Sequence, residues 1–365
     1  MREVTVELGE RSYPIYIGEG LIEQAGEYFT KHEISKKSPL MIVTDENVAS
    51  RHLSKLEVAL QGAGFQVVST IVKPGEKSKS LSVFEDLITK ALEAGLDRKS
   101  TIVALGGGVV GDLAGYVAAS YMRGIKFIQV PTTILAHDSS VGGKVAVNHP
   151  LAKNIIGAFH QPELVLYDLS TLQTLPLRDV KAGLSEVIKS GLIWDAEFVD
   201  WIDNNAERLL ALDEEALGYA LYMGCNIKAQ VVSQDERENS LRMILNLGHT
   251  IGHALEAVAG YNELLHGEAI SIGMIGSARL GVKLGGSEEI YTVTKRVLSR
   301  MGLPVGLPEH LDIDAIMEAM LHDKKFSEGT MVFVVPTAIG EVIIDHSVST
   351  ELVREIVEQL KQEAV

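Results

Sequence analysis

The chain has 365 residues, of which 46% are hydrophobic and 22% charged, and this length is more typical of two domains than of one hydrophobic core. Its formal net charge of -16 disfavours nucleic acid or an anionic membrane as the main partner, because both are negatively charged. No apolar run approaches the roughly 18 to 20 residues that a membrane-spanning helix needs, so no membrane partner is expected.

Two further features of the sequence indicate a cytoplasmic protein. The single cysteine, Cys225, cannot form an internal disulfide, which suits a reducing compartment. The first residues, MREVTVELGE, mix charged with alternating apolar side chains, a pattern typical of neither a signal peptide nor a transit peptide. A cytoplasmic location is therefore expected.

The amino-terminal half alternates short apolar runs with amphipathic stretches. Residues 4–8 and 13–17 are expected to pair as a hairpin. Further strands are predicted at 40–44, 65–72, 101–105, 126–130 and 164–167. Helices are predicted between most of them, near 48–61, 81–94 and 109–120. This alternation indicates a mainly parallel sheet covered on both faces, and such sheets bind ligands beyond the carboxyl ends of their strands.

The pattern changes near Pro176, after which helical periodicity dominates as far as Met320. Two late apolar runs, 331–335 and 341–344, predict a hairpin. Breaks in the helical pattern are expected at residues 195, 212–213, 234–239, 262, 285–286 and 302–308. The sequence therefore predicts an α/β amino-terminal domain with a mainly parallel sheet over residues 1–175, followed by a mainly α-helical domain over residues 176–365.

A glycine-rich turn follows the predicted strand at 101–105. Gly106, Gly108 and Gly111 fit the pattern G-x-G-x-x-G, in which backbone amides at a helix start approach a pyrophosphate. The pattern alone is weakly specific, and a tight strand-to-helix turn without a ligand is the alternative. It falls on the third predicted parallel strand rather than the first, so an ordinary Rossmann unit is not expected.

Polar or glycine-rich loops also follow other predicted parallel strands. Asp45 ends the first of these strands and offers an acceptor for ribose hydroxyls. Residues 74–79 follow the second strand, and residues 131–133 follow the fourth. Together these loops on one edge of a sheet indicate a dinucleotide, although each alone is also typical of a capped helix start.

Four side chains in the carboxyl-terminal half have the chemistry of metal ligands. Glu186 lies in an otherwise apolar helical stretch, where an unpaired carboxylate would be costly. His249 and His253 are four residues apart and share a helix face, and His266 follows. One glutamate and two histidines leave open positions on a metal, as in a catalytic zinc site. The spacing also permits His249 and His253 as a ligand pair, and three ordinary hydrogen-bonded histidines are the alternative to any metal.

Cationic and amide side chains recur in positions that suit a polyanionic substrate. A polar, glycine-bearing loop at 136–144 contains Asp138 and Lys144. Lysines within apolar helical faces are costly to bury, and their convergence on a carboxylate and a phosphate would explain them. Pairing of these lysines with Glu186 or Asp138 is the structural alternative. The candidates are Arg123, Lys144, Lys153, Asn154, Lys189, Lys228, Arg242, Asn246, Lys324 and Lys325.

Several strings together resemble the 3-dehydroquinate synthase family over essentially the whole chain. They are PGEKSKS, LGGGVVGDLAGYVAASYMRG, PTTILAHDSSVGGKVAVNHPLAKNIIGAFHQP, GLSEVIKSG, LNLGHTIGHALE, LHGEAISIGM and HDKK. The resemblance implies an amino-terminal NAD domain and a helical domain that binds one divalent metal, zinc or cobalt. It also implies a homodimer whose small-molecule substrate is a phosphorylated sugar acid, 3-deoxy-D-arabino-heptulosonate 7-phosphate.

The resemblance assigns roles to individual residues. It places the metal on Glu186, His249 and His266, and it makes His253 a catalytic group. Arg123 matches a residue that reaches the phosphate from the neighbouring subunit. Substrate contacts are implied for Asp138, Lys144, Lys153, Asn154, Lys189, Lys228, Arg242, Asn246 and either Lys324 or Lys325. Nucleotide contacts are implied for Asp45, Glu76, Lys79, Gly107, Gly108, Asp112, Thr132, Thr133, Lys144, Lys153, Thr171, Thr174 and Leu175.

The resemblance also implies a reaction, the formation of 3-dehydroquinate in the shikimate pathway. NAD is transiently reduced, phosphate is eliminated, the hydride returns, and an intramolecular aldol step closes the ring. Another sugar phosphate cyclase is the nearest alternative and would act on a different sugar phosphate. A glycerol-type metal-dependent alcohol dehydrogenase would not need so many cations. A non-enzymatic nucleotide-binding module would not need Glu186, His249 and His266 together.

Overall fold

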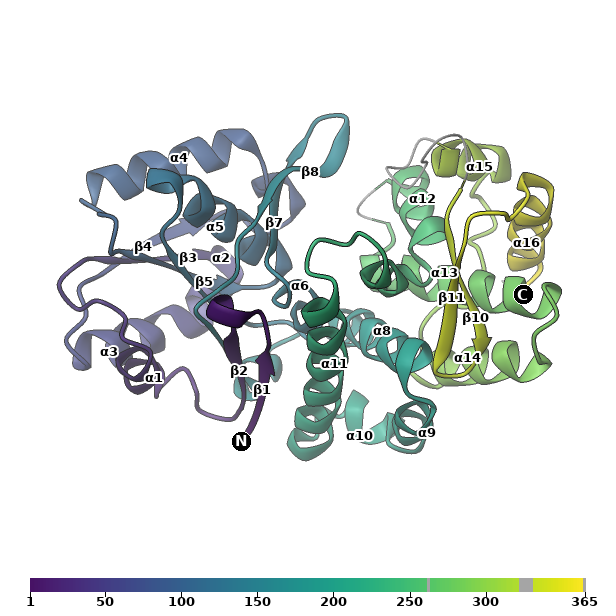
Figure 1. Ribbon diagram of the computed structural model, residues 1–365, viewed down its shortest axis with the longest axis horizontal. Coiled ribbons are helices and arrows are strands. Elements are labelled where there is room, and N and C mark those ends of the chain that lie inside the picture. The colour runs from purple at the N-terminus through teal and green to yellow at the C-terminus, as the bar shows by residue number, and fades with distance from the viewer. Residues whose placement is uncertain (261–262, 322–330, 364–365) are drawn as a thin grey trace. The chain divides into compact units, whose positions relative to one another are not determined.

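The computed structural model describes residues 1–260, 263–321 and 331–363, which form two compact units (Figure 1). The first unit comprises Met1–Leu175 together with Lys228–Arg237, and the second comprises Pro176–Ile227 together with Glu238–Val365. The expected division after residue 175 assigned residues 228–237 to the second domain, whereas these residues pack with the first unit.

A seven-stranded sheet forms the centre of the first unit, with the strand order β1-β2-β9-β6-β5-β3-β4 (Figure 1). β1 and β2 pair antiparallel, and every other neighbouring pair in this sheet is parallel. The mainly parallel sheet predicted from the sequence is therefore confirmed. The strands are β1 (Arg2–Val6), β2 (Tyr13–Gly18), β3 (Leu40–Asp45), β4 (Val67–Val72), β5 (Thr101–Gly106), β6 (Lys126–Pro131) and β9 (Leu164–Asp168).

Helices cover both faces of this sheet, because alternate residues of each buried strand point to opposite sides. Val103 of β5 packs into a core that includes Phe29 of α1, and its neighbour Ile102 packs into a second core with Leu113 of α5. Every residue of β5 is buried, which explains why this strand is continuously apolar. The covering helices are α1 (Ala25–Lys31) and α3 (Ser54–Gly62) in the first core, and α4 (Leu81–Glu93) and α5 (Gly108–Ser120) in the second.

The first hairpin also joins the parallel sheet. β2 pairs in parallel with β9, with Ile15 opposite Val165 and Ile17 opposite Tyr167. The glycine-rich turn after β5 therefore follows the fourth parallel strand in chain order, not the third as predicted. The prediction was wrong because the hairpin pattern indicates only that β1 and β2 pair. It does not show that β2 also pairs with β9 along its other edge.

A second hairpin was not predicted from the sequence. β7 (Lys144–His149) and β8 (Ala152–Phe159) pair antiparallel, and β7 packs against α5. α6 (Ala136–Ser139) occupies the start of the stretch predicted as a loop. β8 has lysine and asparagine near its start, contains a glycine and has no buried residue, so it lacks the continuous buried run of the central strands.

Shorter elements connect the main ones in the first unit. The helix predicted near 48–61 is divided by a π-helical turn, and α1 was not predicted. The short elements are η1 (Gly9–Arg11), α2 (Glu46–Val48), the π-helical turn η2 (Ala49–Leu53), η3 (Glu76–Ser78), η4 (Tyr121–Arg123) and α7 (Leu169–Leu172).

The second unit is mainly helical, as predicted, and contains a late antiparallel hairpin. None of the helices that the structure describes is long and apolar enough to cross a membrane. The last turns of α11 group with the first unit, where Glu236 beyond the helix pairs with Arg11 and Gln161. The elements are α8 (Leu177–Trp194), α9 (Ala196–Asn204), α10 (Ala206–Leu210), α11 (Glu214–Gln234), η5 (Leu241–Asn246), α12 (His249–Ala259), α13 (His266–Lys283), α14 (Glu288–Arg300), α15 (Ile313–Leu321), β10 (Phe333–Ala338), β11 (Glu341–Asp345) and α16 (Thr350–Gln362).

Glycines bring α8, α12 and α13 unusually close together. A Cβ added at Gly273 of α13 would lie 1.9 Å from the carbonyl oxygen of Gly248, which precedes α12. A Cβ at Gly267 would lie 1.9 Å from the carbonyl oxygen of Ala182 in α8. Because these three helices carry Glu186, His249 and His266, the close backbone contacts set the spacing of the candidate metal ligands.

Replacing Gly273 with alanine should therefore destabilise the protein, because the new methyl group meets backbone that has no room to move. We expect G273A to lower the free energy of unfolding by about 2 kcal/mol or more in a denaturant titration. Gly62 of α3 has nothing within 4 Å of an added Cβ, so G62A is the matched control and should leave stability unchanged or slightly raised. Equal stability of the two variants would contradict the close packing.

Candidate functional site

A buried carboxylate lies at the centre of the second unit. Glu186 occupies the middle of α8 and is 1% exposed. Its carboxylate forms an ion pair with Lys189, one turn along the same helix. Its Oε1 also lies 3.7 Å from Nε2 of His249 and 3.4 Å from Nε2 of His266. A charge this deeply buried needs partners of opposite charge or a metal, and the fold brings such groups to it from three helices.

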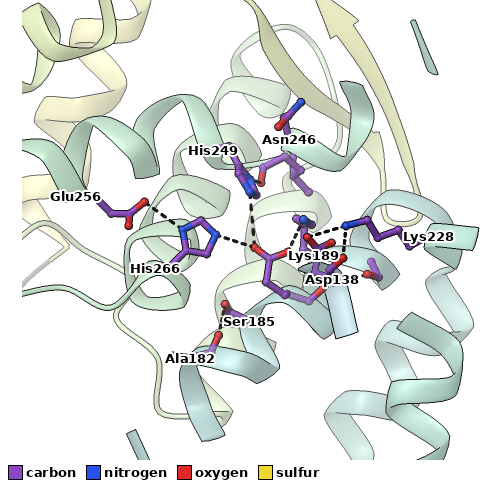
Figure 2. Close-up of polar contacts among 12 residues, drawn as sticks. Asp138, Ala182, Ser185, Lys189, Lys228, Asn246, His249, Glu256 and His266 are labelled. Atoms are coloured by element: carbon purple, nitrogen blue, oxygen red, sulfur yellow. Dashed lines mark hydrogen bonds and ion pairs between the residues drawn. The ribbon is translucent and has the colours of Figure 1, made fainter. Parts of the chain in front are cut away.

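The two histidines are held so that the same ring nitrogen faces Glu186. His249 begins α12, and its Nδ1 lies 3.1 Å from the carbonyl oxygen of Leu247, which can only accept. His266 begins α13, and its Nδ1 lies 3.1 Å from Oε2 of Glu256 (Figure 2). A bond at Nδ1 fixes the ring and leaves Nε2 as the ligand nitrogen, the usual arrangement around metal-bound histidine.

The donor set of this cluster fits a divalent metal such as zinc or cobalt. One carboxylate oxygen of Glu186 and one ring nitrogen each of His249 and His266 all lie within 4.8 Å of one another. Two imidazoles and a carboxylate are ligands that these metals accept, and three protein ligands leave a coordination position open for substrate. Glu186, His249 and His266 are therefore the residues that would hold the metal.

The ionisation of His266 reflects the same surroundings. Burial lowers the pKa of His266, but the hydrogen bonds to Glu186 and Glu256 and the attraction of their negative charges together outweigh burial and raise the pKa to about 9. A proton on Nε2 and a metal would occupy the same position beside Glu186. Metal binding at this nitrogen is therefore in competition with a proton.

A second group of side chains shares His266. His253, Glu256 and His266 also place one ligand atom each within 4.8 Å of one another. The ring centroid of His253 lies 5.2 Å from that of His249 and 6.0 Å from that of His266. His253 thus lies beside the Glu186 cluster without belonging to it, and the geometry keeps both ligand sets as candidates.

Glu256 was missed in the sequence analysis. It is 7% exposed and lies on α12 seven residues after His249 and three after His253. This spacing puts all three side chains on one face of the helix. The i, i+4, i+7 spacing of two histidines and a glutamate was the available signal.

The remaining site candidates of the second unit are deeply buried or close to acids. Lys189 and Arg242 are each 1% exposed. Asn246 ends η5 and donates from Nδ2 to Oε1 of Glu238, a second acid that the sequence analysis missed, at 3.0 Å. Lys324 and Lys325 lie outside the described residues.

In the first unit, Lys228 contacts Asp138. Its Nζ lies 2.9 Å from Oδ2 of Asp138 and also donates to the carbonyl oxygen of the same residue (Figure 2). Lys228 is 7% exposed, so this pair is partly removed from water. Both pairings named as the structural alternative, Lys189 with Glu186 and Lys228 with Asp138, are therefore present.

The other cationic substrate candidates of the first unit lie nearer its surface. Lys144 begins β7 and is exposed, and Lys153 of β8 is partly exposed. Arg123 is exposed and has a positive φ of 68°, next to Gly124 with a φ of 118°. A non-glycine residue in this backbone region is uncommon, so the turn holds Arg123 in a defined position.

All the candidate nucleotide residues except Lys144 and Lys153, which lie on the β7–β8 hairpin, follow the carboxyl ends of neighbouring parallel strands. This is the edge at which open α/β sheets bind ligands. The residues are Asp45 at the end of β3, Glu76 and Lys79 after β4, Gly107, Gly108 and Asp112 after β5, Thr132 and Thr133 after β6, and Thr171, Thr174 and Leu175 after β9.

The sequence left open whether these loops bind a dinucleotide or only cap helices and make tight turns. Two features of this edge bear on that question. Asp45 accepts hydrogen bonds from the backbone N–H groups of Asn47 and Val48, so it does cap a helix start, and both bonds use Oδ1. A Cβ at Gly107 would lie 3.0 Å from the Thr133 side chain. The glycine turn therefore lets the start of α5 pack directly against the loop after β6.

Lys79 and Asp112 form a buried pair within this edge. Nζ of Lys79 lies 2.5 Å from Oδ2 of Asp112 and also donates to Oδ1 of Asn154. Burial raises the pKa of the Asp112 carboxyl, and the Lys79 ammonium acts in the opposite direction. The pair joins a candidate nucleotide loop to the hairpin that carries three candidate substrate residues.

Comparison with known proteins gives matches along both units. Residues 69–182 match the family described as 3-dehydroquinate synthase N-terminal, and residues 183–326 match 3-dehydroquinate synthase C-terminal. A 3-dehydroquinate synthase from Desulforamulus reducens is 50% identical over 346 residues, which cover 94% of this chain and 96% of the relative.

Two solved structures have the same fold over nearly the whole chain. A 2-deoxy-scyllo-inosose synthase complexed with carbaglucose-6-phosphate, NAD+ and Co2+ is 27% identical, with a TM-score of 0.90, and the match covers 98% of this chain and 100% of that one. A 2-epi-5-epi-valiolone synthase from Streptomyces hygroscopicus, with NAD+ and Zn2+ bound, is 25% identical, with a TM-score of 0.87, and the match covers 98% of each chain.

The two candidate ligand sets can be separated by single substitutions. If Glu186, His249 and His266 hold the metal, H266A should lose it, whereas H253A should keep most of it. Metal content after gel filtration, measured by elemental analysis, gives the answer. Loss of metal from H253A with retention in E186Q would move the site to His253, Glu256 and His266.

Glu256 should strengthen metal binding through His266 rather than by binding the metal itself. We expect E256A to weaken zinc affinity about 10- to 100-fold, because the ring of His266 loses the acceptor that orients it. Competition with a chromophoric chelator measures this affinity. Glu288, exposed at the start of α14, provides the control E288A, which should bind zinc like the original protein. Unchanged affinity in E256A would rule out this role.

Proposed function

The chain belongs to the 3-dehydroquinate synthase family, and we propose that it converts 3-deoxy-D-arabino-heptulosonate 7-phosphate to 3-dehydroquinate and inorganic phosphate. The observation that carries this proposal is the cluster of Glu186 with the Nε2 atoms of His249 and His266, in a chain that also has a row of polar loops along a parallel sheet edge. When bound, NAD would supply reversible hydride transfer, and a divalent metal would polarise substrate oxygens.

The first unit is suited to hold the dinucleotide. The turn at Gly107 and Gly108 opens α5, so backbone N–H groups at the start of this helix are available to a pyrophosphate. Asp45 offers a carboxylate to the ribose hydroxyls at the end of β3. Glu76, Lys79 and the threonines after β6 and β9 complete the proposed contacts.

The second unit is suited to hold the oxygens of the substrate near a proton acceptor. His253 lies beside His249 and His266, within reach of the oxygens that a metal there would bind, and we assign proton transfer to its ring. The fixed Nδ1 bonds of His249 and His266 hold their rings before substrate arrives. Because these rings are already fixed, fewer side chains have to move during the reaction.

The cationic residues supply local positive charge in a chain whose net charge is -16. Arg242 and Lys189 are buried in the second unit, and Lys228 is buried in the first. We propose that they meet the carboxylate and phosphate of the substrate together with the other candidates of the sequence analysis. Glu186 pairs with Lys189 and Asp138 pairs with Lys228. These acids balance the charges of the two lysines when no substrate is bound.

Two finer statements belong to the same proposal. We propose a homodimer in which Arg123 reaches the phosphate in the neighbouring subunit, a role supported by its exposure and its fixed turn conformation. We also propose a cytoplasmic location, which a single buried cysteine, Cys225, supports because it forms no internal disulfide.

A different sugar phosphate cyclase is the second candidate function. The two solved relatives, which are named as other synthases, share the fold at 27% and 25% identity, well below the 50% identity to the named 3-dehydroquinate synthase. This difference favours the seven-carbon substrate.

The proposed function predicts phosphate release that depends on NAD and metal without lasting NADH. One equivalent of phosphate should appear per 3-deoxy-D-arabino-heptulosonate 7-phosphate consumed, with NAD present in catalytic amount. Both products are followed in one reaction, by a phosphate assay and by absorbance of NADH. A chelator should stop the reaction, and zinc or cobalt should restore it.

Two other results would change the assignment. Steady accumulation of NADH, with glycerol or a simple alcohol as the better substrate, would identify an alcohol dehydrogenase. If phosphate were released only from a different sugar phosphate, the reaction type would stand but the proposed substrate would be wrong.

A further inference from the structure

Asn148 on the β7–β8 hairpin joins two parts of the first unit that carry different candidate ligand contacts. Its Nδ2 donates to Oε1 of Glu76 in the loop after β4, at 2.7 Å. Its Oδ1 accepts from the backbone N–H of Asn154 in β8, at 2.9 Å. Its own backbone N–H donates to the carbonyl oxygen of Lys79, at 2.9 Å. Glu76 and Lys79 are candidate nucleotide residues, and Asn154 is a candidate substrate residue.

These bonds form part of a closed ring. Lys79 donates to Oδ1 of Asn154 and also to Asp112 at the start of α5. The ring thus runs from Glu76 through Asn148 and Asn154 to Lys79, which lies three residues from Glu76 in the chain. It ties together the loop after β4, the hairpin and α5, all within the first unit (Figure 1).

The chemistry of the ring requires an amide at position 148. The Glu76 carboxylate can only accept, and the Asn154 N–H can only donate, so the orientation of the Asn148 amide is fixed by its partners. An aspartate at this position would keep the acceptor for Asn154 but would place a second carboxylate against Glu76. An alanine would lose both bonds.

Asn154 has a backbone conformation that its hydrogen-bond partners help to define. Its φ is +55°, in the left-handed region that asparagine adopts more readily than other non-glycine residues. The bond from its N–H to Asn148 and the bond from Lys79 to its side chain hold it there. The position of the Asn154 side chain is therefore set by the same residue that orients Glu76.

We propose that Asn148 is a positioning residue that couples nucleotide binding to substrate binding, by fixing Glu76 and Asn154 in one hydrogen-bonded unit. The inference rests on the proposed function for the identity of the two ligands. Asn148 itself need touch neither ligand. A nucleotide that fixes the Glu76 side chain would also fix Asn154, because Asn148 is bonded to both. A substrate that fixes Asn154 would stabilise the position of Glu76 through the same two bonds.

A double-mutant cycle on nucleotide affinity tests the bond between Asn148 and Glu76. The dissociation constant of NAD+ is measured by calorimetry for the original protein, N148D, E76Q and the variant with both changes. We expect N148D to weaken NAD+ binding at least about tenfold. The E76Q amide can donate to the N148D carboxylate, so the double variant should bind NAD+ as well as E76Q alone.

The kinetics give a second readout, the Michaelis constant for the phosphorylated substrate at saturating NAD. N148A, which loses both bonds, should raise this constant more than N148D, which keeps the acceptor for Asn154. N204D makes the same change at an exposed site on α9 and is the control for added charge. If N148D does not fold, N148S removes the amide without adding charge; it should also weaken NAD+ binding, but E76Q should not restore that binding because serine offers no carboxylate to the new amide.

The outcomes separate this inference from the proposed function. Unchanged NAD+ affinity in N148D, or losses that simply add in the double variant, would overturn the role of Asn148 while phosphate release by the original protein stands. A protein that binds no NAD+ would also overturn it. A protein that binds NAD+ with the expected coupling but releases no phosphate would keep the role of Asn148 and refute the proposed function.

Discussion

The buried carboxylate of Glu186 is the constraint on which the second unit depends. An ionised group that is 1% exposed must be matched by charge, hydrogen bonds or metal, and removal of any partner leaves a costly buried charge. The chain meets this need with Lys189 on the same helix and with Nε2 of two histidines that begin α12 and α13. The close backbone contacts at Gly267 and Gly273 allow those helices to approach. Helix packing and histidine orientation thus both help to compensate the buried charge of Glu186, and the proposed metal site uses the same groups.

The first unit uses polar networks in place of a single buried charge. Its parallel strands end in loops whose polar groups line one edge, and the Lys79–Asp112 pair connects that edge to the β7–β8 hairpin. Local cations such as Lys79 and Lys228 would let a chain with a net charge of -16 bind an anionic ligand. Lys228 forms an ion pair with Asp138 and lies in the part of α11 that packs with this unit. Surface charge thus governs solubility, whereas the local cations govern the proposed recognition.

The sequence predicted the features that depend on local pattern and missed those that depend on distant partners. The apolar runs of β3, β5 and β9, and the i,i+4 spacing of His249 and His253, are visible within a few residues of the chain. The pairing of β2 with β9 joins residues about 150 apart, and no local pattern records it. Glu256 and Asn148 were missed for a related reason, since each acts through a hydrogen bond to another element. The β7–β8 hairpin was missed because β8 has lysine and asparagine near its start, contains a glycine and is only partly buried, so it lacks a clear strand pattern.

The claim that Glu186 and the two histidines form a metal centre is tested most directly by diffraction at the cobalt absorption edge. Crystals of the protein prepared with cobalt would be measured above and below the edge, so that the anomalous difference marks the metal alone. We expect one peak per chain, bound by the Glu186 carboxylate and by Nε2 of His249 and His266. A peak bound instead by His253, Glu256 and Nδ1 of His266, or the absence of any peak in fully loaded crystals, would contradict it.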